Sequence, residues 1–360
     1  MLIVYILILL LCFVILARIV DLFFIASLDK ISKDLKLSSD AAGATLMAVG
    51  SSAPELFVAL FSVIKPGEHQ AIGIGSIVGS AIFNLLVIVG AAAVVRKSKL
   101  SWEPLLRDLF FYALAVGLLV TFIWDGRFTL VESGIFLVVY VAYVVAVVYW
   151  RRWLPYEDTG DDFIDEPIRK NKKTRSRLLA LHYVSHEHFT GLLDKFLNFL
   201  FPKKEKYYQV FIVSILLIAA LSYILVEVAV ESAHILQIPE AIIALTVLAV
   251  GTSIPDLFSS IIVARQGRGD MAVSNAIGSN IFDILVGLGL PFLIIMMIEG
   301  NTIDAGGNII RSVIILFGSL LLLIFLLLSQ RWKVGKPTGI ILIVTYIAYV
   351  IYEVYQMYAH

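Results

Sequence analysis

The chain has 360 residues, of which 60% are hydrophobic and only 16% are charged, and its 28 basic and 28 acidic residues leave no net charge. A soluble domain carries about 25% charged residues, and a chain that binds nucleic acid is usually basic. The composition therefore excludes a soluble enzyme and gives no sign of a nucleic-acid partner. The charges are also unevenly placed, because 21 of them lie between residues 151 and 207.

Outside that stretch, the chain divides into apolar segments long enough to cross a membrane as helices, which takes about 20 residues each. We expect ten such segments, near 2–27, 41–64, 71–95, 105–124, 130–150, 208–233, 240–264, 271–298, 309–330 and 338–358. The alternating pattern of a membrane β-barrel is absent. The sequence therefore predicts an all-α polytopic membrane protein whose lipid partner is the bilayer, with five helices on each side of a charged loop at 151–207.

The basic residues predict the orientation, because cytoplasmic loops retain an excess of Lys and Arg. If the N-terminus lies outside, 24 of the 28 basic residues fall on the cytoplasmic side. The outer loops then hold only Lys65, Arg127 and Arg311. We therefore expect both termini outside and a cytoplasmic loop over 151–207.

Two short blocks occur twice. GSSAPELF at 50–57 matches GTSIPDLF at 251–258, and GSAIFN at 79–84 matches GSNIFD at 278–283. Five predicted helices separate the copies, an odd number, so the copies enter the membrane from opposite sides. Inverted repeats of this kind are typical of secondary transporters that bind their substrate at the midplane. We expect two inverted five-helix repeats, 1–150 (motif 43–84) and 208–360 (motif 244–283).

Each first block places a proline and an acid inside an apolar segment, as Pro54-Glu55 and Pro255-Asp256. Proline removes a backbone donor and clashes with the carbonyl group four residues earlier. A broken helix is tolerated in lipid only where its freed backbone faces protein or water. We therefore expect the second and seventh helices to be broken and their backbone carbonyl groups to face a binding site.

The blocks collect oxygen ligands where charge is expensive, since an ionisable group within a span costs about 2.5–3.5 kcal/mol. No Cys or His accompanies them, which disfavours zinc and favours calcium or sodium. Small-residue helix packing explains Ser80 and Ser279 as well as ligation does. The candidate ligands are Glu55, Asp256, Asp283, Asn84, Ser51, Ser52, Thr252 and Ser253, with Ser80 and Ser279 as possible additions.

Other polar residues have structural explanations. Arg107 and Asp108, at the start of the fourth span, are expected to form an interfacial pair. Glu227 and Glu231 are four residues apart and share one face of a helix. They could line an ion path, but an interfacial position near the outer end of the helix explains them at least as well. The loop histidines His182, His186 and His188 are better explained by a solvated amphipathic helix than by a metal site.

The blocks and their flanks resemble the alpha-repeats of the cation/calcium exchanger superfamily, most closely those of the potassium-dependent sodium/calcium exchangers. The resemblance includes DLFF at 21–24, LSSDAAGAT at 37–45, WEPLLRD at 102–108 and IVARQGRGDMAVS at 262–274. It covers nearly the whole chain, and only the loop at 151–207 lies outside it. That loop is too short for the large regulatory calcium-binding domains of animal potassium-independent exchangers.

The resemblance implies a secondary antiporter that exchanges sodium for calcium, in the cell membrane, with no cofactor and no obligate protein partner. It implies that Glu55 and Asp256 coordinate calcium, and that the motif hydroxyl groups and the carbonyl groups of Ala48 and Ala249 contribute to the ion sites. Asn84 and Asp283 supply the remaining ligands. An acid at the Asp283 position accompanies potassium transport in the potassium-dependent members, although some microbial exchangers carry it without needing potassium.

Charge counting gives a mechanism. Three buried carboxylates carry −3, and either calcium plus potassium or three sodium ions neutralise them, whereas unpaired buried charge is costly. We expect alternating access, with the first and sixth helices sliding over the rest, only when the site is loaded. A proton/calcium antiporter on the same fold and a cation channel remain open alternatives. The motifs of an intramembrane hydrolase are absent.

Overall fold

The computed structural model describes residues 2–35, 48–65, 67, 69–153, 191, 193–203, 205–265, 269–300, 302–304 and 309–359. Its elements in chain order, with π-helical turns labelled η, are α1 (Leu2–Ile19), η1 (Val20–Phe24), α2 (Ile25–Asp34), α4 (Ala48–Ser51), α5 (Ala53–Ile64), α6 (Gln70–Phe83), η3 (Asn84–Ile88), α7 (Val89–Val95), β1 (Ser98–Lys99), α8 (Trp102–Phe122), β2 (Arg127–Phe128), α9 (Leu130–Trp153), α11 (Tyr207–Leu236), α12 (Glu240–Ile243), η4 (Ala244–Leu248), α13 (Ala249–Arg265), α14 (Gly269–Phe282), η5 (Asp283–Leu288), α15 (Gly289–Glu299), β3 (Ile303–Asp304), α16 (Ile309–Ser329), β4 (Lys333–Val334) and α17 (Lys336–Ala359). The three loop histidines and residues 41–47 of the second predicted span lie outside the described residues.

The described part of the chain is helical wherever the sequence is apolar. Eight of its helices are long and apolar enough to cross a membrane. A ninth is obtained if Glu240–Ile254 and Asp256–Arg265, which are bent by 54°, count as one span. Ala53–Ile64 is apolar but short. A helical membrane-type fold is therefore present, while the count of ten spans stays a prediction.

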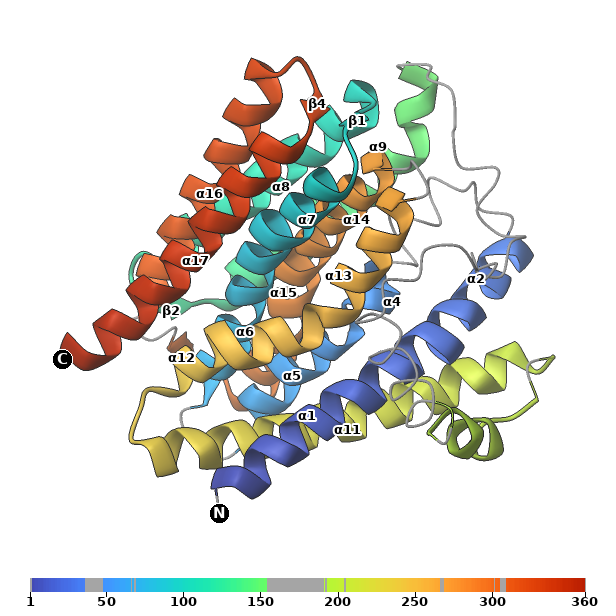
Figure 1. Ribbon diagram of the computed structural model, residues 1–360. Helices are drawn as coiled ribbons and strands as arrows, with labels where there is room; N and C mark the ends of the chain where they lie inside the picture. Colours follow the sequence, from blue (N-terminus) through green and yellow to red (C-terminus); the bar gives the residue numbers. More distant parts are fainter. Residues whose placement is uncertain are drawn as a thin grey trace, which may run out of the picture.

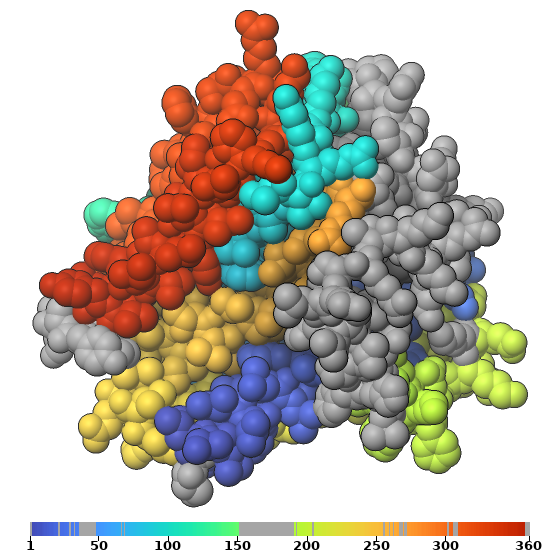
Figure 2. All heavy atoms as spheres, viewed as in Figure 1, coloured from blue at the N-terminus to red at the C-terminus, as the bar shows by residue number. Residues whose placement is uncertain are grey.

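The helices form two packed groups (Figure 1). α1 lies beside α11, and their buried side chains form one hydrophobic cluster that includes Leu16 and Leu225. A larger cluster is centred on α6 to α9 and α14 to α17. In the space-filling view, α12 and α13 run as a yellow-to-orange band between α1 and α17 (Figure 2). The segment with the second copy of the first block therefore lies between the two groups.

Two small sheets tie distant parts of the chain together. β1 pairs with β4, with Ser98 opposite Val334, and β2 pairs with β3, with Arg127 opposite Asp304; both pairings are antiparallel. β1 and β4 lie at one end of the molecule, and β2 lies toward the other end (Figure 1). Each sheet joins a strand from the first half of the chain to one from the second half.

The helices, like the strands, pair across the two halves of the chain. α7 packs against α17, where a side chain on Gly90 would lie 3.1 Å from the carbonyl oxygen of Gly339. α15 packs against α9, where a side chain on Gly289 would lie 3.3 Å from the carbonyl oxygen of Ser133. Gly90 and Gly289 are 199 residues apart, the same offset as the second sequence blocks. Each contact thus has a counterpart in the other half of the chain.

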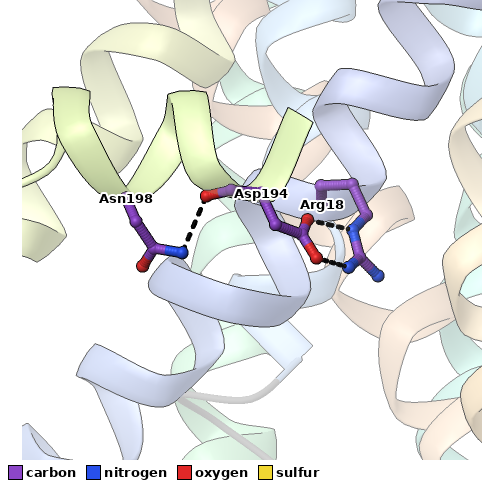
Figure 3. Close-up of polar contacts among 3 residues, drawn as sticks. All are labelled: Arg18, Asp194 and Asn198. Atoms are coloured by element: carbon purple, nitrogen blue, oxygen red, sulfur yellow. Dashed lines mark hydrogen bonds and ion pairs between the residues drawn. The ribbon is translucent and has the colours of Figure 1, made fainter. Parts of the chain in front are cut away.

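The end of the charged loop folds back onto α1 (Figure 3). Arg18 Nε donates a 2.8 Å hydrogen bond to Asp194 Oδ1, and Arg18 Nη2 pairs with Asp194 Oδ2. The rings of Phe23 and Phe201 stack with their centroids 3.8 Å apart. Residues 193–201 are therefore attached to the α1–α11 group.

The predicted pairing of Arg107 with Asp108 is confirmed, but the pair is buried inside the helix packing. Both residues are buried, at 1% and 2% exposure, and Arg107 Nε lies 2.8 Å from Asp108 Oδ1. Tyr143 of α9 donates a 3.2 Å hydrogen bond to the same carboxylate oxygen. Because α8 begins at Trp102, residue 107 already lies more than one turn inside the helix, and the adjacent opposite charges satisfy each other there.

Candidate functional site

The first sequence block forms an interrupted helix. α4 ends at Ser51, Ser52 is a turn residue with φ −94° and ψ 7°, and α5 resumes at Ala53 with Pro54 in its first turn. The Ser52 amide still donates a 3.0 Å hydrogen bond to the carbonyl oxygen of Ala48. The interruption is therefore a single residue, and it places Glu55 in the first turn of α5.

The second copy of that block stays helical through α13 but is bent by 54° between Ile254 and Asp256. The Thr252 hydroxyl donates to the carbonyl oxygens of Leu248, at 3.0 Å, and Ala249, at 3.4 Å. Both carbonyl groups expected as ligands therefore accept a hydrogen bond from their own copy of the motif. The carbonyl oxygen of Ala48 accepts from the Ser52 amide, and that of Ala249 accepts from the Thr252 hydroxyl group.

The second sequence blocks end in matching distortions. η3 begins at Asn84 and η5 begins at Asp283, so each predicted ligand is the first residue of a π-helical turn. π-turns are rare and are frequent at functional sites. Both side chains are 1% exposed. The same local distortion thus occurs at equivalent points of the two copies.

The two copies meet through their hydroxyl groups. Ser51 Oγ, in the first copy, lies 3.1 Å from Ser279 Oγ in the second. Ser80 Oγ, in the first copy, lies 2.8 Å from Ser253 Oγ in the second. Each contact joins a first block to the second block of the other copy, so the predicted site residues are brought together from α4, α6, α13 and α14.

The carboxylates lie at this meeting point. Glu55 is 2% exposed and lies beside the hydroxyl groups of Thr252 and Ser253. Asp283 lies beside Ser52, close enough to Glu55 and Asp256 to interact with both charges. The site therefore concentrates negative charge around two buried carboxylates, Glu55 and Asp283, and a partly buried one, Asp256.

Several buried oxygen atoms of the site have no hydrogen-bond partner among the described residues. They are Glu55 Oε2, Asn84 Oδ1 and both carboxylate oxygens of Asp283. A buried polar atom without a partner is costly and needs an explanation. Acceptor atoms that converge at one place without donors are the arrangement that a cation would complete.

The donor set is dominated by oxygen. Within the described residues, His, Cys, Asp and Glu do not form a group of three or more that could hold a metal ion by themselves. Any cation here must therefore also use hydroxyl, amide or carbonyl oxygens. Such ligands suit calcium and sodium and do not suit zinc or copper.

Two residues that contact this site, Asn280 and Tyr112, were not predicted from the sequence. Asn280 Nδ2 donates to the carbonyl oxygen of Ala81, at 3.1 Å, and to the hydroxyl oxygen of Tyr112, at 3.0 Å. Asn280 Oδ1 accepts a 3.0 Å hydrogen bond from Asn84 Nδ2. The signal was present in the sequence, because Asn280 is the polar mismatch to Ala81 between the two second blocks. Tyr112 carries no such signal.

Known proteins resemble the chain over nearly its full length. The family model described as "Sodium/calcium exchanger protein" matches residues 4–149 and 206–355. Sodium/potassium/calcium exchanger 5 of Homo sapiens is 31% identical, over 96% of this chain and 81% of the relative. Sodium/potassium/calcium exchanger 4 of Mus musculus is 29% identical, over 92% of this chain and 78% of the relative.

Two solved structures share the fold. The sodium-calcium exchanger NCX_Mj superposes with a TM-score of 0.59 at 23% identity, covering 98% of this chain and 99% of that one. The H+/Ca2+ exchanger CAX superposes with a TM-score of 0.68 at 14% identity, covering 99% of this chain and 88% of that one. At these identities, the similarity establishes the fold alone.

Proposed function

Because the chain belongs to the sodium/calcium exchanger family, we propose that it exchanges sodium for calcium across a membrane by alternating access and carries potassium together with calcium. The observation that carries this proposal is the cluster of buried oxygen atoms without hydrogen-bond partners on Glu55, Asn84 and Asp283. These atoms lie where the two motif copies meet, and transported cations would supply the missing partners.

The ion balance explains why exchange would be coupled. The carboxylates of Glu55, Asp256 and Asp283 carry −3 together when ionised. Calcium with potassium, or three sodium ions, would neutralise them. An empty site would leave the buried charges of Glu55 and Asp283 without a cation beside them in a region of low dielectric constant, which is costly. The empty transporter would therefore interconvert slowly between its outward-facing and inward-facing states, and this would suppress uncoupled ion leak.

The ligands we assign to the ions are the side chains of Glu55, Asp256, Asp283, Asn84, Ser51, Ser52, Thr252 and Ser253 and the carbonyl oxygens of Ala48 and Ala249. Ser80 and Ser279 are further candidates. Their hydroxyl groups contact Ser253 and Ser51, so they could serve either as ligands or as the contacts that hold the copies together.

We further propose the ten-span architecture, with inverted repeats at 1–150 and 208–360 and broken second and seventh helices. The matching contacts between the two halves of the chain support this architecture. β1–β4 and β2–β3 are equivalent pairings under the repeat, as are α7–α17 and α15–α9. The N-terminal end of α1 and the C-terminal end of α17 lie on the same side in Figure 1, as an even number of spans requires.

The moving part would be the α1–α11 pair. Its side chains belong to a hydrophobic cluster that is separate from the larger one and also takes in residues of α5 and η4, and α1 crosses α13 at Gly251. A side chain on Gly251 would overlap the ring of Phe13 in α1. Because glycine has no side chain to interlock with the ring, this contact would let α1 slide over the site. The larger hydrophobic cluster would keep the remaining helices together.

Orientation and membrane are also proposals. The asymmetry of basic residues, 24 against 3 in the loops, favours outside termini and a cytoplasmic loop at 151–207. The attached segment 193–201 would then contact α1 from the cytoplasmic side. The cell membrane is the location we propose from the family.

Potassium transport rests on two observations. The relatives at 31% and 29% identity are named sodium/potassium/calcium exchangers. In this chain an acid, Asp283, ends the second block of the second repeat, GSNIFD at 278–283. A proton/calcium antiporter is the alternative, because the H+/Ca2+ exchanger CAX has the same fold. In that case a carboxylate of the site would cycle a proton in place of sodium.

The test is radioactive calcium uptake into proteoliposomes loaded with sodium, with and without potassium outside. Uptake that requires both ions supports the whole proposal. Uptake that requires sodium but ignores potassium removes potassium from it. Uptake that is indifferent to internal sodium contradicts sodium exchange, and uptake driven by a pH gradient in sodium-free medium would establish the proton antiporter instead.

A further inference from the structure

The two copies of the site end in chemically different residues. Asp283 is a carboxylate, and either of its oxygens can face a cation. Asn84 is an amide, and only one of its two terminal atoms is an acceptor. If the amide turned over, an NH2 group would face the ions and repel them. Asn84 therefore needs to be oriented in a way that Asp283 does not.

A hydrogen-bond network supplies that orientation. It starts at the carbonyl oxygen of Ala81, which can only accept, so the Asn280 atom 3.1 Å away must be its nitrogen. The same nitrogen also donates to the hydroxyl oxygen of Tyr112, at 3.0 Å. With both N–H groups engaged, the other terminal atom of Asn280 is an acceptor and faces Asn84.

The orientation of Asn280 then determines that of Asn84. Asn280 Oδ1 requires a donor, so Asn84 presents its nitrogen, at 3.0 Å. The Asn84 nitrogen also lies 3.5 Å from Ser80 Oγ. Asn84 Oδ1 is thereby directed elsewhere, and it is one of the buried atoms without a hydrogen-bond partner among the described residues.

We infer that Tyr112 and Asn280 are positioning residues, which hold the Asn84 amide with its oxygen toward the transported cation. The inference rests on the proposed function. Both residues are fully buried, at 0% exposure, so water does not compete for their hydrogen bonds. They belong to α8 and α14, so the orientation depends on contacts between both halves of the chain.

The test is a double-mutant cycle on calcium affinity. Tyr112→Phe removes one acceptor for Asn280 and keeps the ring, and we expect the calcium concentration for half-maximal uptake to rise about fivefold. Asn280→Ala removes the network and should raise it about tenfold. In an Asn84→Asp background, both effects should fall below about twofold, because a carboxylate needs no orientation. Equal effects in both backgrounds, or no effect of either change with Asn84 present, would overturn the inference.

Tyr346→Phe is the matched control. The Tyr346 hydroxyl is buried and has no hydrogen-bond partner among the described residues, so its removal should leave calcium affinity unchanged. An effect as large as that of Tyr112→Phe would contradict a specific role for Tyr112. Calcium-dependent thermal stabilisation of the purified full-length variants gives a second readout that does not require transport. If the native chain binds calcium with this pattern but does not exchange it for sodium, the proposed function fails and the positioning role stands. If it shows no calcium-dependent stabilisation, the positioning role fails as well.

Discussion

The two copies of the repeat share a framework and differ in charge. Ser51–Ser279 and Ser80–Ser253, at 3.1 and 2.8 Å, each join a first block to the second block of the other copy, and both second blocks end in a π-turn. The first copy, however, ends in a neutral amide that is held by Asn280, whereas the second ends in a carboxylate. Contacts made by both copies therefore build the site, and the one unmatched charge is the feature best placed to select among ions.

The largest effect should follow from removing the matched acids, Glu55 and Asp256. Glu55→Gln and Asp256→Asn each keep the shape and remove one charge, so we expect calcium affinity to fall by about 30- to 100-fold, or about 2–3 kcal/mol. Sodium-driven calcium uptake over a range of calcium concentrations measures this. The Glu231→Gln variant, an exposed acid on α11, is the control, and near-normal uptake in Glu55→Gln would disprove the ligand assignment.

Asp283→Asn makes the two copies end in the same residue. The site charge then falls from −3 to −2, which calcium alone neutralises. We expect uptake to continue at a rate about tenfold lower, for the loss of one charge-assisted ligand, and to become independent of potassium. Parallel uptake assays with potassium or a large organic cation outside measure this. A variant that still requires potassium would show that Asp283 does not carry that dependence.

The glycines of the first blocks should differ in their sensitivity. A side chain on Gly251 would overlap the aromatic ring of Phe13, whereas one on Gly50 would lie 2.8 Å from the flexible Leu28 Cδ1 atom. Overpacking costs about 1–3 kcal/mol, and a ring yields less readily than a leucine tip. We expect Gly251→Ala to slow exchange about tenfold and Gly50→Ala to slow it less.

Adding Phe13→Leu to Gly251→Ala separates a steric effect from a backbone effect. The smaller side chain should restore most of the exchange rate, measured at saturating calcium and normalised to protein amount. If both glycine variants behave alike, the contact between α1 and α13 is not what limits sliding.

How far the sequence predicts this structure depends on the kind of contact. The apolar segments predict the long helices well, because a backbone in lipid must satisfy its own hydrogen bonds, and a single segment can do so only as a helix. The repeated blocks predicted Glu55, Asn84 and Asp283 as residues of one site, since matching blocks in opposite halves of the chain imply a common meeting point. The family resemblance is confirmed by the comparisons.

The failures concern contacts between helices that share no motif. The sequence predicted the pairing of Arg107 with Asp108 but not its burial against Tyr143 of α9. Tyr112 was missed because its hydroxyl becomes meaningful only when α14 brings Asn280 to it. The sequence placed Glu227 near the outer end of its helix and Lys65 in an outer loop, but it did not reveal that the two side chains lie 2.5 Å apart. Pairings of this kind depend on tertiary structure, which single-sequence periodicity does not encode.

The smallest effects should come from the hydroxyl contacts shared by both copies. Ser279→Ala removes the hydrogen bond to Ser51, and Ser80→Ala removes the one to Ser253 together with the longer 3.5 Å contact from Asn84. A neutral hydrogen bond contributes about 0.5–1.5 kcal/mol, so we expect at most a tenfold rise in the half-maximal calcium or sodium concentration. If the serines only hold the copies together, each variant should change the calcium and sodium affinities by similar factors. If one serine is also a direct ligand, its variant will instead weaken one ion selectively. Measuring both affinities in both variants therefore decides whether these serines hold the copies together or bind the ions.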